Sequence, residues 1–225
     1  MIKLDKLIIF DMDNTLIQSY LDFPLMKAET LRLLRKGGYE PDETLPLTHT
    51  MGLFRTSERF SPKLEAFIWD RVDEIEYAGL KNAVPEPGIE RTLEFLSPYA
   101  HIVALTNTKE EAARSVLLQL GLADRLEYIM GRGGARELKP APGGMLDLMA
   151  RYPYITAKDT LVVGDALIDI QAARGAGAHF CAYNRSRAEQ WLSAGYEPDM
   201  SLHSWDDNAA RQMLALLGCE VAVHG

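Results

Sequence analysis

Short apolar runs alternate with amphipathic stretches over most of this chain, a pattern typical of buried strands separated by helices. The apolar runs lie at residues 7–10, 102–105, 127–130, 161–163 and 179–182. The stretches with helical spacing lie at residues 89–96, 110–120, 143–151, 168–174, 187–193 and 208–217, two of them closed by Gly121 and Gly175. Because strands and helices alternate, the pattern predicts an α/β fold with a doubly wound, Rossmann-like parallel sheet of five strands.

The segment between the first two strands is several times longer than the dozen or so residues that a simple βαβ crossover needs. A helix is predicted at residues 24–36, where the glycine pair at 37–38 favours a helix end. Ser61 and Pro62 then begin a second helix. Its predicted apolar face contains Leu64, Phe67, Ile68, Val72, Ile75 and Ala78. This segment therefore holds helical structure of its own.

The chain of 225 residues suits one ample domain, or one domain with a smaller insert. The turn-rich stretch at residues 85–88, with two prolines and a glycine, marks the end of the helical segment. We therefore expect a helical cap domain at residues 17–84. The core domain is then made of residues 1–16 and 85–225.

Residues 48–55 of the expected cap look like a connection between helices. A single His or Arg in such a loop is more often solvated than functional. His49 and Arg55 are noted because a cap that closes over a site presents polar groups to the substrate.

The composition, with 47% hydrophobic and 25% charged residues, is typical of a soluble globular protein. A net charge of −8 argues against nucleic acid as the main partner. Cys181 and Cys219 fit no metal-ligand or redox spacing. The run at residues 7–10 is too short for the apolar core of a signal peptide, and no run approaches the ~20 residues of a membrane span. We therefore expect a cytoplasmic protein without a membrane partner.

Two carboxylates directly follow the first strand, at Asp11 and Asp13. In extended chain, residues two positions apart project to the same side, so both carboxylates face one side of the strand's end. Two buried like charges repel each other unless a cation or a shared proton lies between them. The alternative is a polar turn in which residues 13–15 cap backbone groups.

The later strands also end in small polar residues. Thr106 and Asn107 follow the second strand, Asp165 follows the strand at 161–163, and Asp169 lies one helical turn further on. In an open α/β sheet, ligands bind beyond the carboxyl ends of the strands. Hydroxyl, amide and carboxylate groups at these ends suit a phosphate and a hard cation.

Some residues near these strand ends also have a local interpretation, whereas Thr106 and Asn107 lie where a hydroxyl and a helix N-terminus can hold an anion. Thr108 and Glu111 fit a capping box at the start of the following helix, and Thr108 is assigned that role. Asp165 could cap the next helix, and Asp169 could be a first-turn acid favoured by the helix dipole. The order and placement of the residues therefore count for more than any one of them.

Lys139 supplies a cation in a loop that Pro140 and Pro142 stiffen, just before a predicted helix. The glycine-rich stretch at residues 131–134 precedes it but lacks the Gly-Lys-Ser/Thr ending of a P-loop. We interpret that stretch as a flexible connection.

Taken in order, these residues resemble the four motifs of the haloacid dehalogenase superfamily, close to its phosphoglycolate phosphatase-like group with a helical cap. The first motif is matched by residues 11–15, although Asn14 stands where Gly is common, and the second by Thr106 and Asn107. Lys139 and Pro140 match the third motif, and residues 164–169 match the fourth.

The resemblance implies an Mg²⁺-dependent phosphatase that acts on a small phosphorylated metabolite through an aspartyl-phosphate. In that family the residue matching Asp11 is the nucleophile, and the one matching Asp13 is the general acid and base. The metal is held by the Asp11 carboxylate, the backbone carbonyl of Asp13 and the Asp165 carboxylate, with Asp169 orienting these ligands.

The same resemblance assigns Thr106, Asn107 and Lys139 to the phosphoryl oxygens. Two alternatives remain open. One is a phosphomutase of the β-phosphoglucomutase type, and the other is a non-catalytic binding or regulatory protein with the same fold. The candidate substrates are phosphoglycolate, a sugar phosphate, a nucleoside monophosphate and pyrophosphate.

Overall fold

The computed structural model describes residues 4–184 and 188–219. The chain divides into two compact units, which we call the core unit (Met1–Gln18 and Val84–Gly225) and the helical unit (Ser19–Ala83). The carboxylates, Lys139 and the strand-end threonines that the sequence singles out all belong to the core unit.

The core unit contains a six-stranded sheet in which every pair of neighbouring strands is parallel. Its strands are β1 (Leu7–Phe10), β4 (His101–Lys109), β5 (Tyr128–Arg132), β6 (Thr160–Gly164), β7 (His179–Tyr183) and β8 (Met200–Leu202). The strand order is β5-β4-β1-β6-β7-β8, which confirms the predicted doubly wound α/β fold. The sequence predicted five of these strands. β8 was missed because it has three residues, of which only Leu202 is buried.

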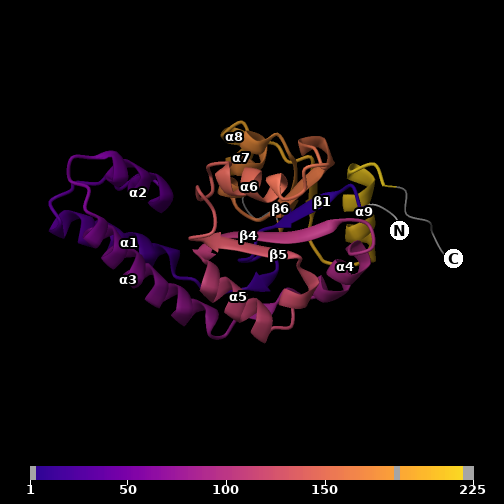
Figure 1. Ribbon diagram of the computed structural model, residues 1–225, viewed down its shortest axis with the longest axis horizontal. Helices are drawn as coiled ribbons and strands as arrows, with labels where there is room; N and C mark the ends of the chain where they lie inside the picture. The colour runs from indigo at the N-terminus through magenta and orange to yellow at the C-terminus, as the bar shows by residue number, and fades with distance from the viewer. Residues whose placement is uncertain (1–3, 185–187, 220–225) are drawn as a thin grey trace. The chain divides into compact units, whose positions relative to one another are not determined.

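Helices cover both faces of this sheet. They are α4 (Ile89–Leu96), α5 (Glu110–Gln119), α6 (Gly143–Ala150), α7 (Leu167–Ala176), α8 (Ala188–Ser193) and α9 (Asp207–Leu216), with short 3₁₀ turns η1 (Ala123–Arg125) and η2 (Ala157–Asp159). Figure 1 shows α6, α7 and α8 on one face of the sheet and α4 and α5 on the other. α9 packs against α4. Of the predicted helix at 187–193, residue 187 lies outside the described residues.

β1 lies at the centre of the sheet and is fully buried along its length. The chain passes from β1 to β4 and β5 on one side, and later returns to β6, β7 and β8 on the other. The carboxyl end of β1 is therefore the topological switch point, where open α/β sheets bind their ligands. The sequence places Asp11 and Asp13 there.

The end of α7 differs from the sequence prediction. The helix continues through Gly175 and stops at Gly177, which has φ of 74°, a left-handed conformation that glycine adopts at little cost. Gly175 has a packing role instead, because a Cβ built there would lie 3.1 Å from the ring of Pro142. Two nearby glycines in a sequence do not reveal which one ends the helix.

Two short antiparallel strands join the segments that lead out of the core unit and back into it. β2 (Ile17–Gln18) pairs with β3 (Val84–Pro85). Just beside this ladder, the N–H of Glu86 donates to the carbonyl of Leu16 at 2.9 Å. These hydrogen bonds hold together the two points of the core unit between which residues 19–83 are inserted.

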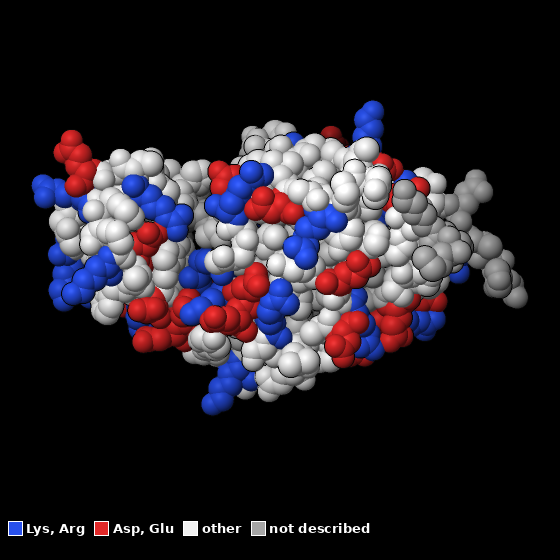
Figure 2. Space-filling model, viewed as in Figure 1, with Lys and Arg blue, Asp and Glu red and all other residues white. Residues whose placement is uncertain are grey.

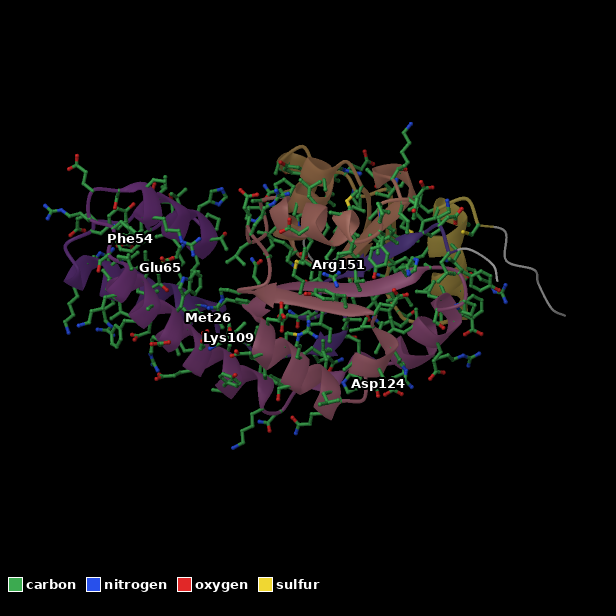
Figure 3. The ribbon with its side chains drawn as sticks, in the orientation of Figure 1. Met26, Phe54, Glu65, Lys109, Asp124 and Arg151 are labelled. Atoms are coloured by element: carbon green, nitrogen blue, oxygen red, sulfur yellow. The ribbon has the colours of Figure 1, made fainter. Side chains whose placement is uncertain are left out.

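The helical unit contains α1 (Phe23–Lys36), α2 (Leu47–Thr56) and α3 (Pro62–Leu80). As predicted, α1 ends before Gly37 and Ser61 caps α3, where its hydroxyl accepts from the N–H of Leu64 at 3.3 Å. Its main apolar cluster joins all three helices and contains Leu33, Leu34, Met51, Phe54 and Ile68. Figure 3 labels Phe54 in this cluster and Met26 in a neighbouring one.

Two predictions for this unit were wrong. Residues 48–55 form most of α2 and not a loop; Gly52 and several threonines weaken the helical signal there, but Met51 and Phe54 bury the helix against its neighbours. On α3, Ile68, Val72 and Ile75 are buried as predicted, but Phe67 and Ala78 are exposed, so the buried face is rotated from the predicted one.

Charges of both signs are interspersed on the face of the molecule drawn in Figure 2, which carries no extended basic surface. None of the helices in the described part of the chain combines the length and apolar character needed to cross a membrane.

Asp199 ties the start of β7 to α7 and provides a test of the fold. Its carboxylate accepts from the N–H of Phe180 at 2.7 Å and pairs with Arg174 at 2.8 Å. Burial alone would raise the pKa of Asp199, but the Phe180 N–H, Arg174 and His179 together lower it. A carboxyl group with a lowered pKa stabilises the fold above its unfolded-state pKa, and this stabilisation disappears as the pH falls.

We therefore expect Asp199→Asn to lower the free energy of unfolding at pH 7 by about 1–2 kcal/mol. The difference from wild type should shrink below pH ~4 as the wild-type carboxyl takes up a proton. Urea denaturation at several pH values measures both effects. Asp207→Asn, which removes the exposed ion pair with Arg91, is the matched control and should cost less than about 1 kcal/mol. A pH-independent difference at Asp199 would contradict the electrostatic explanation.

Candidate active site

The backbone turns sharply after β1. The N–H of Asp11 still follows the sheet and donates to the carbonyl of Val163 at 2.8 Å. Asn14 then has φ of 56°, in the left-handed region that Gly, Asn and Asp tolerate best. This conformation explains how Asn14 can stand where the resemblance leads one to expect Gly. The turn keeps Asp11 and Asp13 at the carboxyl end of β1, where each residue is 8% exposed.

Lys139 lies between two carboxylates. Its ammonium donates to Asp11 Oδ1 at 2.5 Å, to Asp169 Oδ1 at 2.6 Å and to the carbonyl of Leu105 at 3.1 Å. Only 3% of Lys139 is exposed. Burial alone would lower the pKa of this lysine, but Asp11 and Asp169 outweigh that effect and raise it, so the side chain is a permanent cation.

Asp169 orients its neighbours from the first turn of α7. Its Oδ2 accepts from the N–H of Ala166 at 3.0 Å, while its Oδ1 pairs with Lys139. Gly164 permits this approach, because a Cβ there would lie 2.5 Å from Asp169 Oδ2. Asp169 therefore lies in the first turn of α7, as predicted, and it also forms an ion pair with Lys139. The residue at the N-cap of α7 is Ala166 and not Asp165, so the local interpretation of Asp165 was wrong.

Asp11, Asp165 and Asp169 form an acidic cluster in which one carboxylate oxygen from each lies within 4.8 Å of the others. Burial raises the pKa of Asp165 to about 7, and the charge of Asp169 adds to the rise. Burial also raises the pKa of Asp11 well above its usual range; Lys139 opposes this rise, and the other carboxylates add to it. Lys139 alone therefore does not neutralise the cluster. The three closely spaced carboxylate oxygens are donors that suit a hard divalent cation, and such a cation would favour the ionised form of these groups.

Two threonines of β4 hold Asp13. Thr108 donates its hydroxyl to Asp13 Oδ2 at 3.1 Å, and the Thr106 hydroxyl lies 3.4 Å from the same oxygen. The predicted capping role of Thr108 was wrong: α5 has Lys109 at its N-cap position and no side-chain cap bond. β4 runs four residues beyond the predicted end of the strand, which turns Thr108 toward Asp13.

Asn107 binds the backbone of Lys139 with both ends of its amide. Its Nδ2 donates to the Lys139 carbonyl at 2.8 Å, and its Oδ1 accepts from the Lys139 N–H at 2.9 Å. The carbonyl of Asn107 in turn accepts from Nε of Arg132 at 3.2 Å. The side chain that the resemblance assigns to phosphate is therefore engaged in holding the lysine loop.

The structure thus brings together all seven residues that the sequence selected, and it adds Thr108. The seven are Asp11, Asp13, Thr106, Asn107, Lys139, Asp165 and Asp169. The alternation rule that pairs Asp11 with Asp13 would also have paired Thr108 with Thr106, had the strand been extended that far. In the helical unit, His49 is exposed on α2 and Arg55 forms an ion pair with Glu65.

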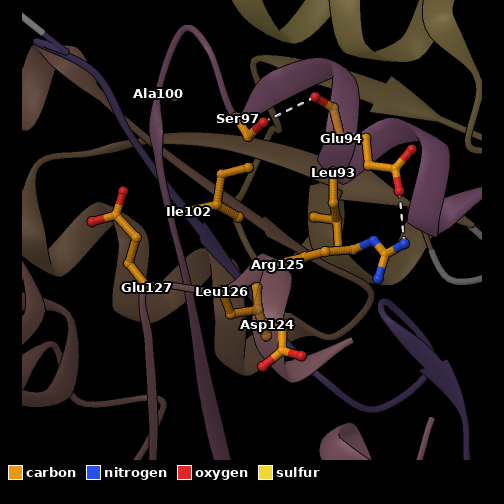
Figure 4. Close-up of a pocket in the computed structure, with 9 residues that line it drawn as sticks. All are labelled: Leu93, Glu94, Ser97, Ala100, Ile102, Asp124, Arg125, Leu126 and Glu127. Carbon is orange, nitrogen blue, oxygen red and sulfur yellow. Dashed lines mark hydrogen bonds and ion pairs between the residues drawn. The ribbon is translucent and has the colours of Figure 1, made fainter. Parts of the chain in front are cut away.

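A separate cavity of about 270 Å³ lies at the opposite, amino end of the strands. It is lined by α4, η1 and the starts of β4 and β5, and an ion pair between Arg125 and Glu94 at 2.6 Å crosses one side (Figure 4). None of the seven residues lines it. The polar chemistry is therefore concentrated at the switch point and not in this cavity.

Comparison with known proteins also covers the residues at the switch point. The family model described as haloacid dehalogenase-like hydrolase matches residues 8–183, which include every residue of the site. A phosphoglycolate phosphatase from Aquifex aeolicus is 30% identical over 180 residues, covering 76% of this chain and 81% of that protein. One from Xylella fastidiosa is 32% identical over 180 residues, covering 76% of this chain and 77% of that protein.

Among solved structures, a predicted phosphoglycolate phosphatase from Haemophilus somnus superposes with a TM-score of 0.63 at 19% identity. The match covers 94% of this chain and 100% of that chain. At such low identity the likeness supports the fold alone.

Proposed function

The chain belongs to the haloacid dehalogenase-like hydrolase family, and we propose that it is an Mg²⁺-dependent phosphatase that hydrolyses a small phosphomonoester, with phosphoglycolate the first candidate. The observation that carries this proposal is the buried ammonium of Lys139 between Asp11 and Asp169 at the switch point. A fixed cation beside a nucleophile is suited to a dianionic substrate, because it offsets the repulsion between carboxylate and phosphate. The named relatives support the phosphate ester as the substrate class.

Asp11 is the proposed nucleophile. Its carboxylate oxygen attacks phosphorus, the ester P–O bond breaks, and an aspartyl-phosphate forms on Asp11. Asp13 gives a proton to the departing alkoxide oxygen. It then takes a proton from the water that attacks the phosphorus of the aspartyl-phosphate, so that phosphate leaves and both carboxyl groups return to their starting states.

Thr106 and Lys139 are proposed to bind the phosphoryl oxygens, because they offer a hydroxyl and a permanent cation beside Asp11. Asn107 contributes by holding the backbone on which Lys139 is carried. Asp169 binds the Lys139 ammonium with one carboxylate oxygen and the N–H of Ala166 with the other, which fixes both groups beside Asp11.

Mg²⁺ would be held by the Asp11 and Asp165 carboxylates and the backbone carbonyl of Asp13, with Asp169 as the orienting neighbour. When bound, it supplies positive charge that draws a phosphate toward the carboxylates and stabilises the charge that develops on its oxygens. The high pKa values that burial gives Asp11 and Asp165 support a role for such a cation, since it would keep both groups ionised.

Phosphate release from a panel of phosphorylated metabolites, with Mg²⁺ and with EDTA, tests the proposal. We expect Mg²⁺-dependent release, with phosphoglycolate among the good substrates, and reversible inactivation by EDTA. An isomeric sugar phosphate in place of free phosphate would identify a phosphomutase. No turnover of any compound would favour a non-catalytic protein, and activity indifferent to EDTA would remove the metal from the mechanism.

The Asn107 side chain provides a more specific prediction. Asn107→Ala removes both hydrogen bonds to the Lys139 backbone, so we expect kcat to fall about tenfold to a hundredfold. Hydrogen exchange at residues 137–141 should become faster in this variant, and Asn208→Ala at an exposed position is the control. If exchange in the loop is unchanged and KM alone rises, Asn107 acts on the substrate directly, as the resemblance implied.

A further inference from the structure

We infer that Thr108 is a positioning residue that fixes the carboxyl group of Asp13 for proton transfer to the leaving group. This inference rests on the proposed function and deepens it. Thr108 matches none of the four motifs, and the sequence alone assigned it to a helix cap.

The geometry around Thr108 is defined by its contacts. β4 continues through Lys109, with an irregularity in its pairing with β5 between Leu105 and Lys109. Thr106 and Thr108 both reach the same oxygen of Asp13, so their hydroxyls project to the same side. Both are nearly inaccessible, with 1% and 4% exposed. The N–H of Thr108 donates to the Thr106 hydroxyl oxygen at 3.1 Å, so one threonine fixes the other.

The Thr108 hydroxyl has one proton, and it is donated to Asp13 Oδ2 at 3.1 Å. The Thr106 contact with the same oxygen is longer, at 3.4 Å, which leaves Thr108 as the better donor. Thr106 is also the residue proposed to bind phosphate. With Oδ2 held by Thr108, the plane of the carboxyl group is fixed, and the proton transfer is assigned to Oδ1, the oxygen that the threonines do not hold.

A positioned proton donor matters most when the leaving group is a poor one. An alkoxide needs the proton as the P–O bond breaks, whereas nitrophenolate is stable enough to leave without it. Loss of the Thr108 hydroxyl should therefore slow the hydrolysis of an alkyl phosphate much more than that of p-nitrophenyl phosphate. A residue that only supports the fold would slow both reactions alike.

The test compares kcat/KM for the best alkyl phosphate of the panel and for p-nitrophenyl phosphate, since this ratio reports the first chemical step. Thr108→Val should lose about tenfold on the alkyl ester and less than about twofold on the aryl ester. Thr108→Ser, which keeps the hydroxyl, should restore the wild-type ratio. In an Asp13→Asn background, Thr108→Val should have little further effect on the alkyl ester, because the group that it positions is already disabled.

The matched control is Thr92→Val. Thr92 is fully buried in α4, and its hydroxyl has no hydrogen-bond partner within the described part of the chain, so this change tests a buried Thr→Val replacement away from Asp13. Unfolding midpoints of all variants are measured alongside; if Thr108→Val is unfolded, Thr108→Ala replaces it in the same comparison.

Equal losses on the two esters, or an additive effect with Asp13→Asn, would overturn the inference while leaving the phosphatase intact. A wild-type protein that hydrolyses neither ester would overturn the proposed function and this inference together.

Discussion

Replacement of Asp11 by Asn is expected to lower kcat by at least about a thousandfold, equivalent to ~4 kcal/mol in the barrier. The amide that replaces the carboxylate cannot attack phosphorus to form the phosphorylated enzyme. It also removes one negative charge from the acidic cluster of Asp11, Asp165 and Asp169.

The same variant should remain folded. Lys139 keeps its ion pair with Asp169 at 2.6 Å, and an Asn at position 11 still offers an oxygen to the ammonium. The loss of one buried carboxylate also relieves repulsion within the cluster. We therefore expect an unfolding midpoint close to that of wild type in EDTA. The control is Asp124→Asn, an exposed acid at the amino end of the sheet, which should keep wild-type rates. Wild-type turnover by Asp11→Asn would refute the nucleophile assignment.

Replacement of Lys139 by Met is expected to have the second large effect, and it should lower both activity and stability. Met fills a similar volume but carries no charge. We expect kcat to fall about a hundredfold or more, ~2.7 kcal/mol, because Lys139 is the cation that binds Asp11 in this site.

Stability should also fall, because removing one partner of a buried ion pair leaves Asp11 and Asp169 as uncompensated charges. Such changes typically cost about 3–5 kcal/mol. Mg²⁺ should restore part of this loss and should therefore raise the melting temperature of Lys139→Met more than that of wild type. Scanning calorimetry with Mg²⁺ and with EDTA measures the difference. Lys158→Met, at an exposed position, serves as the control. An equal response of both proteins to Mg²⁺ would contradict the shared role of Lys139 and the cation.

The sheet was largely predictable because its strands are buried on both faces and appear as continuous apolar runs. β1 was predicted at its observed bounds, Leu7–Phe10. The extension of β4 beyond Leu105 was missed, since Thr106 to Lys109 are polar and resemble a turn in sequence. That single boundary error hid the contact between Thr108 and Asp13, because the direction of a side chain depends on where its strand ends.

The site was predictable as a set of residues and less so as a set of contacts. Asp11, Asp13 and Asp165 follow strands, and the sheet topology brings such positions together. The partner of Asn107 lies 32 residues away in a loop, and no local pattern reveals that its amide binds the Lys139 backbone. Long-range hydrogen bonds of this kind depend on loop conformations that periodicity does not encode.

In the helical unit, two helices were predicted, with the end of the first and the start of the second. α2 was missed because its stability comes from tertiary burial of Met51 and Phe54, whereas Gly52 and its neighbouring threonines have low helix propensity. We still propose that this unit acts as a cap over the site, and that role remains a prediction.

The most direct test of the central claim is chemical trapping of the phosphorylated enzyme. Asp13→Asn should still accept a phosphoryl group from p-nitrophenyl phosphate but should lose it slowly, because the base for the attacking water is gone. Acid quenching, reduction with borohydride and peptide mass spectrometry would then locate the modified residue. The proposed mechanism predicts conversion of Asp11 to homoserine, and none in a variant that also carries Asp11→Asn. Hydrolysis by wild type with no modification of Asp11, or with modification of another residue, would contradict it.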